Sequence, residues 1–210
     1  MSSPASSSGE WSLRVSESSL QGRAHRFFTR RRIQISIVVF GVLLLVNLFV
    51  RRIQPVDLLD LSNPLSAIGL ALLACGLLIR SWAAGTLHKI KTLTNTGIYA
   101  LVRNPLYVGS FLMMFGFCAL LADWLTLAVV AGPLVLMYWA KVRDEEAHLA
   151  RLFPQDWPHY AAATPRFIPR LALPTAAGFS AAQWLHHKEY QAAIASLAAL
   201  LGLYFWRLWW

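Results

Sequence analysis

"LYVGSFLMMFGFCALLADWLTLAVVAGPLVLMYWA", residues 106–140, contains a single charged residue, Asp123. A helix needs about 20 largely apolar residues to cross the hydrocarbon core of a bilayer. The two halves of this stretch, 106–122 and 124–140, both approach that length. We therefore expect two membrane-spanning helices that form a tight helical hairpin around Asp123.

Three further stretches have the same character, at residues 33–50, 65–79 and 191–206. The second could run on to residue 84 only by including Arg80, so periodicity leaves its end open. With 57% hydrophobic and 14% charged residues, the chain is too apolar for an ordinary soluble domain. The predicted fold class is all-α, an integral membrane helical bundle with about five transmembrane helices and polar cytoplasmic segments.

The first 32 residues differ from the rest because they are rich in Ser and end in a cluster of Arg. Such a composition is typical of a disordered basic tail. The apolar stretch at 33–50 ends on Arg51 and Arg52 with no small-residue cleavage site, which favours an uncleaved anchor. We expect a tail at 1–32 followed by one membrane domain at 33–210.

A net charge of +9 is typical of some proteins that bind nucleic acid. However, five spans with an inner N-terminus place every Lys and Arg except Arg51, Arg52 and Arg207 on the inner side. That distribution follows the positive-inside rule, so the charge reflects membrane topology and indicates no nucleic acid. Cys75 and Cys118 both fall within spans and have no metal-ligand spacing, and no metal site is predicted.

Polar residues concentrate in two inner segments, 81–104 and 141–190, where we expect the chemistry because polar groups facing lipid are costly. The first segment leads into "GIYALVRNPLYVGS", residues 97–110. Asn104 and Pro105 form a typical helix start, with Asn as the N-cap and Pro in the first turn.

Arg103 directly precedes this helix start, where free N–H groups and the helix dipole already favour an anion. An added guanidinium would strengthen such an anion site. The alternative is an arginine that binds lipid phosphate at the membrane interface. Tyr99 and Tyr107 are likewise consistent with either a site or simple interfacial aromatics.

The second segment begins "KVRDEEAHLARLF", residues 141–153. At about 100° per residue, Glu145 and Glu146 fall within the apolar stripe of this helix. A carboxylate on an apolar surface costs several kcal/mol unless it is satisfied, so each needs a partner. That partner is either an internal cation, such as Arg103 or a Lys, or a ligand cation. We favour the ligand, because paired acids beside an anion site suit a zwitterion.

Taken together, "TGIYALVRNPLYVG" and "EEAHLARLFPQDWPHYAAATPRFIP" resemble the membrane methyltransferases typified by isoprenylcysteine carboxyl methyltransferase and phospholipid methyltransferases. The shared features are an Arg-x-Pro-x-Tyr-x-Gly run, an acid pair and a closing Pro-Arg-Phe-Ile-Pro segment. The motifs occupy about residues 92–169, within a family-like core at about 64–170.

The resemblance implies S-adenosylmethionine as cofactor, with Arg103 and Glu146 as catalytic residues. It also implies a cofactor pocket made of Tyr99, Arg103, Asn104, Pro105, Tyr107, Glu145, Glu146 and Tyr160, with Arg166 in the closing segment. Asn104 stands where the family usually has His, which keeps a donor but removes a titratable ring. Ile98 and Pro154 also depart from the pattern, which places the chain nearer to bacterial relatives and implies a bacterial inner membrane.

The expected function is methyl transfer to a lipid-associated or small hydrophobic acceptor, a carboxylate, thiol or amine, at the inner membrane face. One alternative is an NAD(P)H-dependent membrane reductase of the sterol-reductase type, although such enzymes usually have more spans. Another is a non-catalytic small transporter or channel with the acid pair as an ion site. In that case the acids should lie within a span, whereas they lie just beyond one. Finally, Ser180 and Gln183 predict a short capped helix before the last span.

Overall fold

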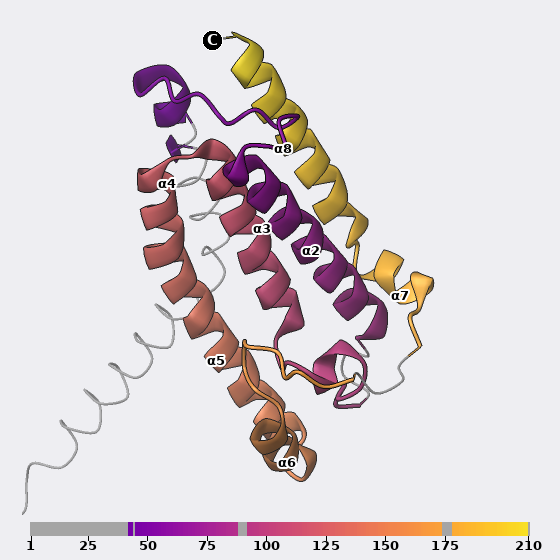
Figure 1. Ribbon diagram of the computed structural model, residues 1–210. Coiled ribbons are helices and arrows are strands. Elements are labelled where there is room, and N and C mark those ends of the chain that lie inside the picture. The colour runs from indigo at the N-terminus through magenta and orange to yellow at the C-terminus, as the bar shows by residue number, and fades with distance from the viewer. Residues whose placement is uncertain (1–41, 44, 88–91, 174–177, 210) are drawn as a thin grey trace, which may run out of the picture. The chain divides into compact units, whose positions relative to one another are not determined.

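The computed structural model of the chain describes residues 42–43, 45–87, 92–173 and 178–209 (Figure 1). The chain forms two compact units, Met1–Val50 and Arg51–Trp210. The described part of the first unit ends in a short π-helix, η1 (Val46–Val50). The expected tail at 1–32 and most of the expected first span lie outside the described residues.

All the elements of the second unit among its described residues are helices, and loops connect them. Its longest helices are α2 (Pro64–Thr86), α3 (Pro105–Leu121), α5 (Val135–Leu152) and α8 (Tyr190–Trp209). Shorter helices are η2 (Ile98–Ala100), α4 (Trp124–Val129), η3 (Val130–Leu134), α6 (Asp156–Ala163) and α7 (Ala181–His186).

Three segments among the described residues are long and apolar enough to cross a membrane: α2, the continuous run Trp124–Leu152, and α8. The fourth apolar helix, α3, is shorter because Pro105 begins it and Ala122 ends it in a left-handed conformation. The predicted all-α fold is confirmed for the described residues, and the several apolar helices support an integral multi-pass membrane protein. The predicted number of five spans is not confirmed, since the described residues give three long spans and one shorter helix.

Close contact between α2 and α3 depends on glycines that face one another across the helix pair. A Cβ atom on Gly76 would lie 2.6 Å from the carbonyl oxygen of Gly109, and one on Gly109 would lie 2.7 Å from that of Gly76. Gly69 and Gly116 repeat this arrangement further along the pair. Small residues let the two backbones approach closely, as is common between membrane helices.

The end of α2 lies beyond the stretch that the hydropathy pattern defined. The helix continues through Arg80 to Thr86. Arg80 is tolerated there because its guanidinium pairs with Glu189 and also donates to Ser110 Oγ. The helix can therefore continue past Arg80 because a tertiary ion pair neutralises that charge, which the periodicity of the sequence could not indicate.

The predicted hairpin around Asp123 is confirmed. Ala122 has φ 50°, which turns the chain, and Asp123 caps α4 by accepting from the backbone N–H and hydroxyl of Thr126. Arg51 donates to the other carboxylate oxygen at 2.7 Å. Burial by itself would raise the pKa of Asp123, but these hydrogen bonds outweigh it and hold the pKa at about 2. After α4 the chain passes through η3, where Pro133 cannot donate a backbone hydrogen bond, into α5.

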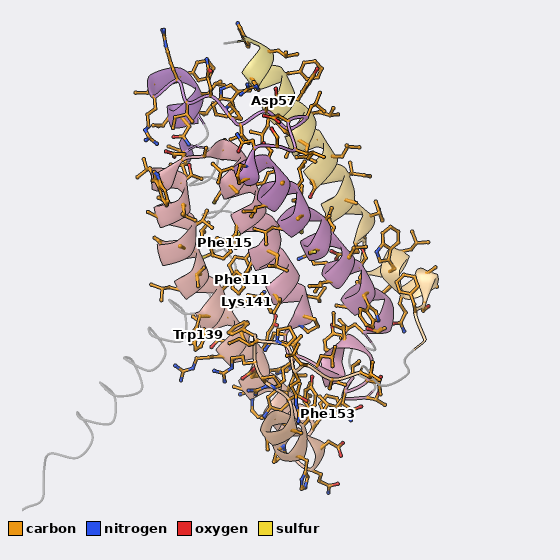
Figure 2. All side chains as sticks on the ribbon, viewed as in Figure 1. Asp57, Phe111, Phe115, Trp139, Lys141 and Phe153 are labelled. Carbon is orange, nitrogen blue, oxygen red and sulfur yellow. The ribbon has the colours of Figure 1, made fainter. Side chains whose placement is uncertain are left out.

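The predicted short helix before the last span is confirmed as α7. The side chain of Ser180 caps it by accepting a hydrogen bond from the backbone N–H of Gln183. Ser180 also donates its backbone N–H to the carbonyl of Gly85, at the end of α2. Lys188, with φ 54°, then turns the chain into α8. At the other end of this unit, Arg207 of α8 donates to the carbonyl of Pro55 and lies 3.7 Å from Asp57. Figure 2 shows Asp57 and Phe153 at opposite ends of this unit.

Candidate functional site

Three segments meet beside α6: the loop that leads into α3, the last turns of α5, and the stretch that follows α6. The backbone N–H of Arg103 donates to the carbonyl of Pro165 at 2.9 Å, and that of Arg170 donates to the carbonyl of Leu101 at 3.0 Å. The stretch 164–170 therefore runs along the loop at 101–103. This pairing brings both halves of the sequence motif to one place.

Glu146 lies at the centre of the cluster and is 6% exposed. Arg166 donates from Nε and NH2 to its two carboxylate oxygens, the shortest contact being 2.6 Å. Arg103 NH1 lies 3.4 Å from Glu146 Oε2. The hydrogen bond to Glu146 raises the pKa of Arg166 above its usual value. One buried carboxylate is thus shared by two guanidinium groups.

Asn104 performs a different task from the one its position suggests. Helix α3 begins at Pro105 as predicted, but the side chain of Asn104 makes no capping hydrogen bond. Its Nδ2 instead donates to Glu146 Oε1 at 2.9 Å and to the carbonyl of Arg166 at 3.3 Å. The expectation of a side-chain N-cap is wrong, because the buried carboxylate of Glu146 takes the amide as a donor.

Glu145 lies on a different side of α5 from Glu146. Its side chain is 50% exposed and forms an i,i+4 ion pair with Lys141 at 3.6 Å. It also interacts with the hydroxyl of Tyr107. The expectation that both acids lie on the apolar face is confirmed for Glu146 and wrong for Glu145, since neighbouring helical residues point about 100° apart. Both carboxylates have internal cations as partners, as the first interpretation of the pair required.

Two buried tyrosines join α6 to the loop before α3. The hydroxyl of Tyr160 donates to the carbonyl of Tyr99 at 2.9 Å. Burial raises the pKa of both phenols well above the usual value. The hydroxyl of Tyr99 has no hydrogen-bond partner among the described residues, although the side chain is only 7% exposed.

An aromatic layer covers the cluster between α3 and α5. Its edge-to-face and tilted ring contacts connect Tyr107, Tyr138, Phe111, Phe167 and Trp139, with neighbouring ring centroids 5.2–5.9 Å apart. The guanidinium of Arg166 lies 5.6 Å from the centroid of Trp139, and Figure 2 shows Trp139 on α5 close to Lys141. None of the sequence patterns described above predicted this layer. Aromatic residues gathered near the ends of two neighbouring spans were the available signal.

The donor set of the cluster suits a ligand with a carboxylate. Two guanidinium groups face one buried carboxylate, and among the described residues Arg103 Nε is buried without a partner. The N-terminus of α3 lies beside them and favours an anion. The structure thus brings Arg103, Asn104, Pro105, Glu146 and Arg166 together, with Tyr99 and Tyr160 beside them and Tyr107 and Glu145 at the edge. Their roles in binding a cofactor remain predictions.

Comparison with known proteins gives a family model and several relatives. The model described as phospholipid methyltransferase matches residues 65–156. The cobalt-zinc-cadmium resistance protein CzcN of Cupriavidus metallidurans is 35% identical over 181 residues, which cover 84% of this chain and 80% of that protein. The nickel-cobalt-cadmium resistance protein NccN of Alcaligenes xylosoxydans xylosoxydans is 34% identical over 149 residues, which cover 70% of this chain and 68% of NccN.

A third relative is the protein-S-isoprenylcysteine O-methyltransferase of Schizosaccharomyces pombe, 32% identical over 82 residues. Those residues cover 39% of this chain and 35% of the yeast protein. No solved structure matches the chain. Arg103, Asn104 and Glu146, together with the glycine contacts of α2 and α3, lie within the residues that the family model matches, whereas Tyr160 and Arg166 lie beyond them.

Proposed function

Because the chain belongs to the family of membrane methyltransferases that the phospholipid methyltransferase model describes, we propose that it transfers a methyl group from S-adenosylmethionine to a hydrophobic acceptor. The observation that carries this proposal is the sharing of the buried Glu146 carboxylate by Arg103 and Arg166. Because two guanidinium groups share one carboxylate, one positive charge is not neutralised. It lies beside a helix N-terminus, where the carboxylate of an amino-acid head group can bind.

We assign the carboxylate of the cofactor to Arg103 and to the start of α3 at Pro105. Its ammonium group suits Glu146, with Glu145 at the open edge of the cluster. Asn104 holds Glu146 in place through its amide, and Tyr160 fixes the loop before α3 through the carbonyl of Tyr99. Each of these groups is held by at least one contact within the cluster, so binding of the cofactor costs little further side-chain entropy.

The cofactor supplies, when bound, an electrophilic methyl group on a positively charged sulfur. The task of the protein is then to position the two reactants, because a displacement at carbon requires the nucleophile and the leaving group to be nearly collinear. The aromatic rings of Tyr138, Trp139 and Phe167 lie on one side of the cluster, where they would limit the access of water once the cofactor is bound. Exclusion of water strengthens the electrostatic interactions on which the positioning depends.

The acceptor is a lipid-associated or small hydrophobic molecule with a carboxylate, thiol or amine. Two relatives carry the names of resistance proteins for cobalt, zinc, cadmium and nickel. Among the described residues there is no group of three or more His, Cys, Asp or Glu that could hold a metal ion, and we propose no metal ligand set.

The proposal is tested with the full chain purified into lipid nanodiscs. We expect S-adenosylmethionine to bind in calorimetry, and a labelled methyl group to pass from it into a total lipid extract or into small thiols. A folded protein that binds neither S-adenosylmethionine nor S-adenosylhomocysteine would contradict the proposal. Binding of NADPH in its place would favour the reductase alternative.

A further inference from the structure

A second buried ion pair lies outside the cluster around Glu146. Arg80 donates from Nε to Glu189 Oε1, and its NH1 donates to Ser110 Oγ and to the carbonyl of Leu106. The side chains of Arg80 and Glu189 are 24% and 8% exposed. Arg80 belongs to a helix that is long and apolar enough to cross a membrane. An ionisable residue in such a helix is expensive and usually marks a functional site.

The path of the Arg80 side chain is set by a glycine. A Cβ atom on Gly109 would lie 2.6 Å from Arg80 Cγ, so no larger residue fits where the arginine crosses α3. Beyond Gly109 the guanidinium reaches Leu106 and Ser110, which are one turn apart on α3. Helix packing thus directs this cation from α2 to one face of α3.

An unsatisfied hydroxyl lies near the same ion pair. Tyr99 is 7% exposed, and among the described residues its hydroxyl has no hydrogen-bond partner. The phenol belongs to a cluster of buried residues that packs against Ile79 and Leu106, and the carbonyl of Leu106 accepts a hydrogen bond from Arg80. A buried donor without a partner destabilises the protein, and this cost is recovered when a ligand accepts its hydrogen bond.

We propose that Arg80, Ser110 and Tyr99 form a binding site for the anionic head group of an apolar ligand, and that Glu189 occupies the place of that anion on Arg80. The inference rests on the proposed function, in which this ligand is the methyl acceptor. Glu189 directly follows Lys188, the positive-φ residue between α7 and α8. It is therefore carried by a turn and can withdraw without unwinding a helix.

The charges nearby favour an anionic ligand over an amine. Cations outnumber acids when the Arg80 pair and the cluster around Glu146 are taken together. The cations are Arg80, Arg103, Lys141 and Arg166, and the acids are Glu145, Glu146 and Glu189. Each of these acids already has a guanidinium or ammonium partner, whereas the Tyr99 hydroxyl is a donor that needs an acceptor. An anion satisfies both the excess cation and this donor.

The test uses the full chain in nanodiscs of uncharged phosphatidylcholine, with dodecanoate, dodecylamine and dodecanol as probes that share one apolar chain. Dodecanoate should bind at least about tenfold more tightly than either other probe, a difference of 1.4 kcal/mol. Arg80→Gln should remove this preference. Glu189→Gln, which keeps the shape but removes the competing charge, should tighten dodecanoate binding by about threefold to tenfold.

Two further variants separate binding from folding. Tyr99→Phe removes a hydroxyl that supports no contact among the described residues, so it should fold normally and weaken dodecanoate binding by about threefold to tenfold. Arg207→Gln removes another arginine of an apolar helix, one that pairs with Asp57, and should leave dodecanoate binding unchanged.

A merely structural ion pair predicts that Glu189→Gln weakens dodecanoate binding or leaves it unaltered, and either result would overturn the inference. A preference for dodecylamine that depends on Glu189 would also overturn it. S-adenosylmethionine affinity is measured in every variant and should not change in Arg80→Gln, Glu189→Gln or Arg207→Gln, whose residues lie outside the expected cofactor pocket. If the parent protein binds no S-adenosylmethionine, the proposed function fails. If the parent protein does bind the cofactor but its dodecanoate affinity is the same in Arg80→Gln and Glu189→Gln, only this inference fails.

Discussion

Glu146 and Arg166 form a paired contact in which Nε and NH2 of the arginine donate to both carboxylate oxygens at 2.6–3.1 Å. The contact joins α5 to the stretch after α6, 20 residues further along the chain. Because Arg103 lies 3.4 Å from the same carboxylate, Glu146 also connects this stretch to the loop before α3. The position of Glu146 therefore determines the geometry of all three segments.

This central position predicts unequal effects within the acid pair. Glu146→Gln removes a buried charge that two arginines share, so it should weaken S-adenosylmethionine binding by roughly 1.5–3 kcal/mol, the range for a hydrogen bond to a charged group. Glu145→Gln should cost less than about 1 kcal/mol, because its carboxylate is half exposed. Calorimetry on folded protein measures both, and equal affinities in parent and Glu146→Gln would contradict the cofactor role.

The two Asn-Pro pairs at helix starts provide a matched comparison. Asn63 caps α2 by accepting from the N–H of Leu65, whereas Asn104 donates to Glu146. Serine is as good an N-cap as asparagine but too short to reach across to α5. Asn63→Ser should therefore change stability by less than about 0.5 kcal/mol, and Asn104→Ser should cost roughly 1–2 kcal/mol. Unfolding in mixed detergent micelles measures this, and equal tolerance at both positions would show that Asn104 acts only as a cap.

Contact between α2 and α3 leads to a prediction about glycine. Gly76→Ala places a methyl group 2.6 Å from the carbonyl oxygen of Gly109, which cannot move aside as a side chain would. We expect a loss of roughly 1–3 kcal/mol, as for overpacking in a core. The control is Gly202→Ala in α8, where an added Cβ meets nothing within 4 Å. Equal stability of the two variants in the same unfolding assay would argue against close packing of α2 on α3.

The fold was largely predictable because hydropathy reports membrane-spanning helices directly. The hairpin at Asp123 and the helix capped by Ser180 are both local features with local signals. The end of α2 was not predictable, since its continuation through Arg80 depends on Glu189, 109 residues away. Helix α3 agrees with the predicted stretch 106–122 to within one residue, but its 17 residues make it shorter than the three long spans.

The candidate site was predictable only where its chemistry lies in short motifs. Arg103 and Glu146 stand out in the sequence as a cation before a helix start and an acid on an apolar stripe, and the structure brings them together. Glu145 was placed on the wrong face because the stripe is wide and its edge is set by tertiary packing. The Arg80–Glu189 pair joins segments with no fixed spacing, so no local pattern could reveal it. The only signal for the aromatic layer was the gathering of aromatic residues near the ends of two neighbouring spans, which does not specify their contacts.

The charge distribution predicts which ends of the helices face outward. Asp60 lies in an exposed loop before α2, and Ala163 is exposed at the end of α6. Single cysteines at these positions, in a background of Cys75→Ala and Cys118→Ala, should label differently in intact cells. We expect an impermeant thiol reagent to reach Asp60→Cys and to leave Ala163→Cys unlabelled until the cells are opened. The reverse pattern would place the candidate site on the outer face.

Arg103→Lys separates the two interpretations of the residue that precedes α3. A lysine keeps the positive charge, so attraction to lipid phosphate would survive the change. It loses the planar guanidinium, and with it the paired donors that a carboxylate binds. In the parent protein, Arg103 NH1 faces Glu146 at 3.4 Å, while Nε is buried and has no partner among the described residues. A cofactor carboxylate at this position would satisfy that nitrogen, and a lysine could not replace it.

We therefore expect Arg103→Lys to weaken S-adenosylmethionine binding by roughly 1.5–3 kcal/mol, measured by calorimetry on protein whose unfolding midpoint shows that it is folded. The matched control is Arg143→Lys, on an exposed part of α5, which should bind the cofactor like the parent. Partition of both variants into vesicles with anionic lipid should be unchanged, since both keep their charge. If Arg103→Lys binds the cofactor as tightly as the parent, Arg103 is an interfacial lipid anchor, and the carboxylate of the cofactor must bind elsewhere.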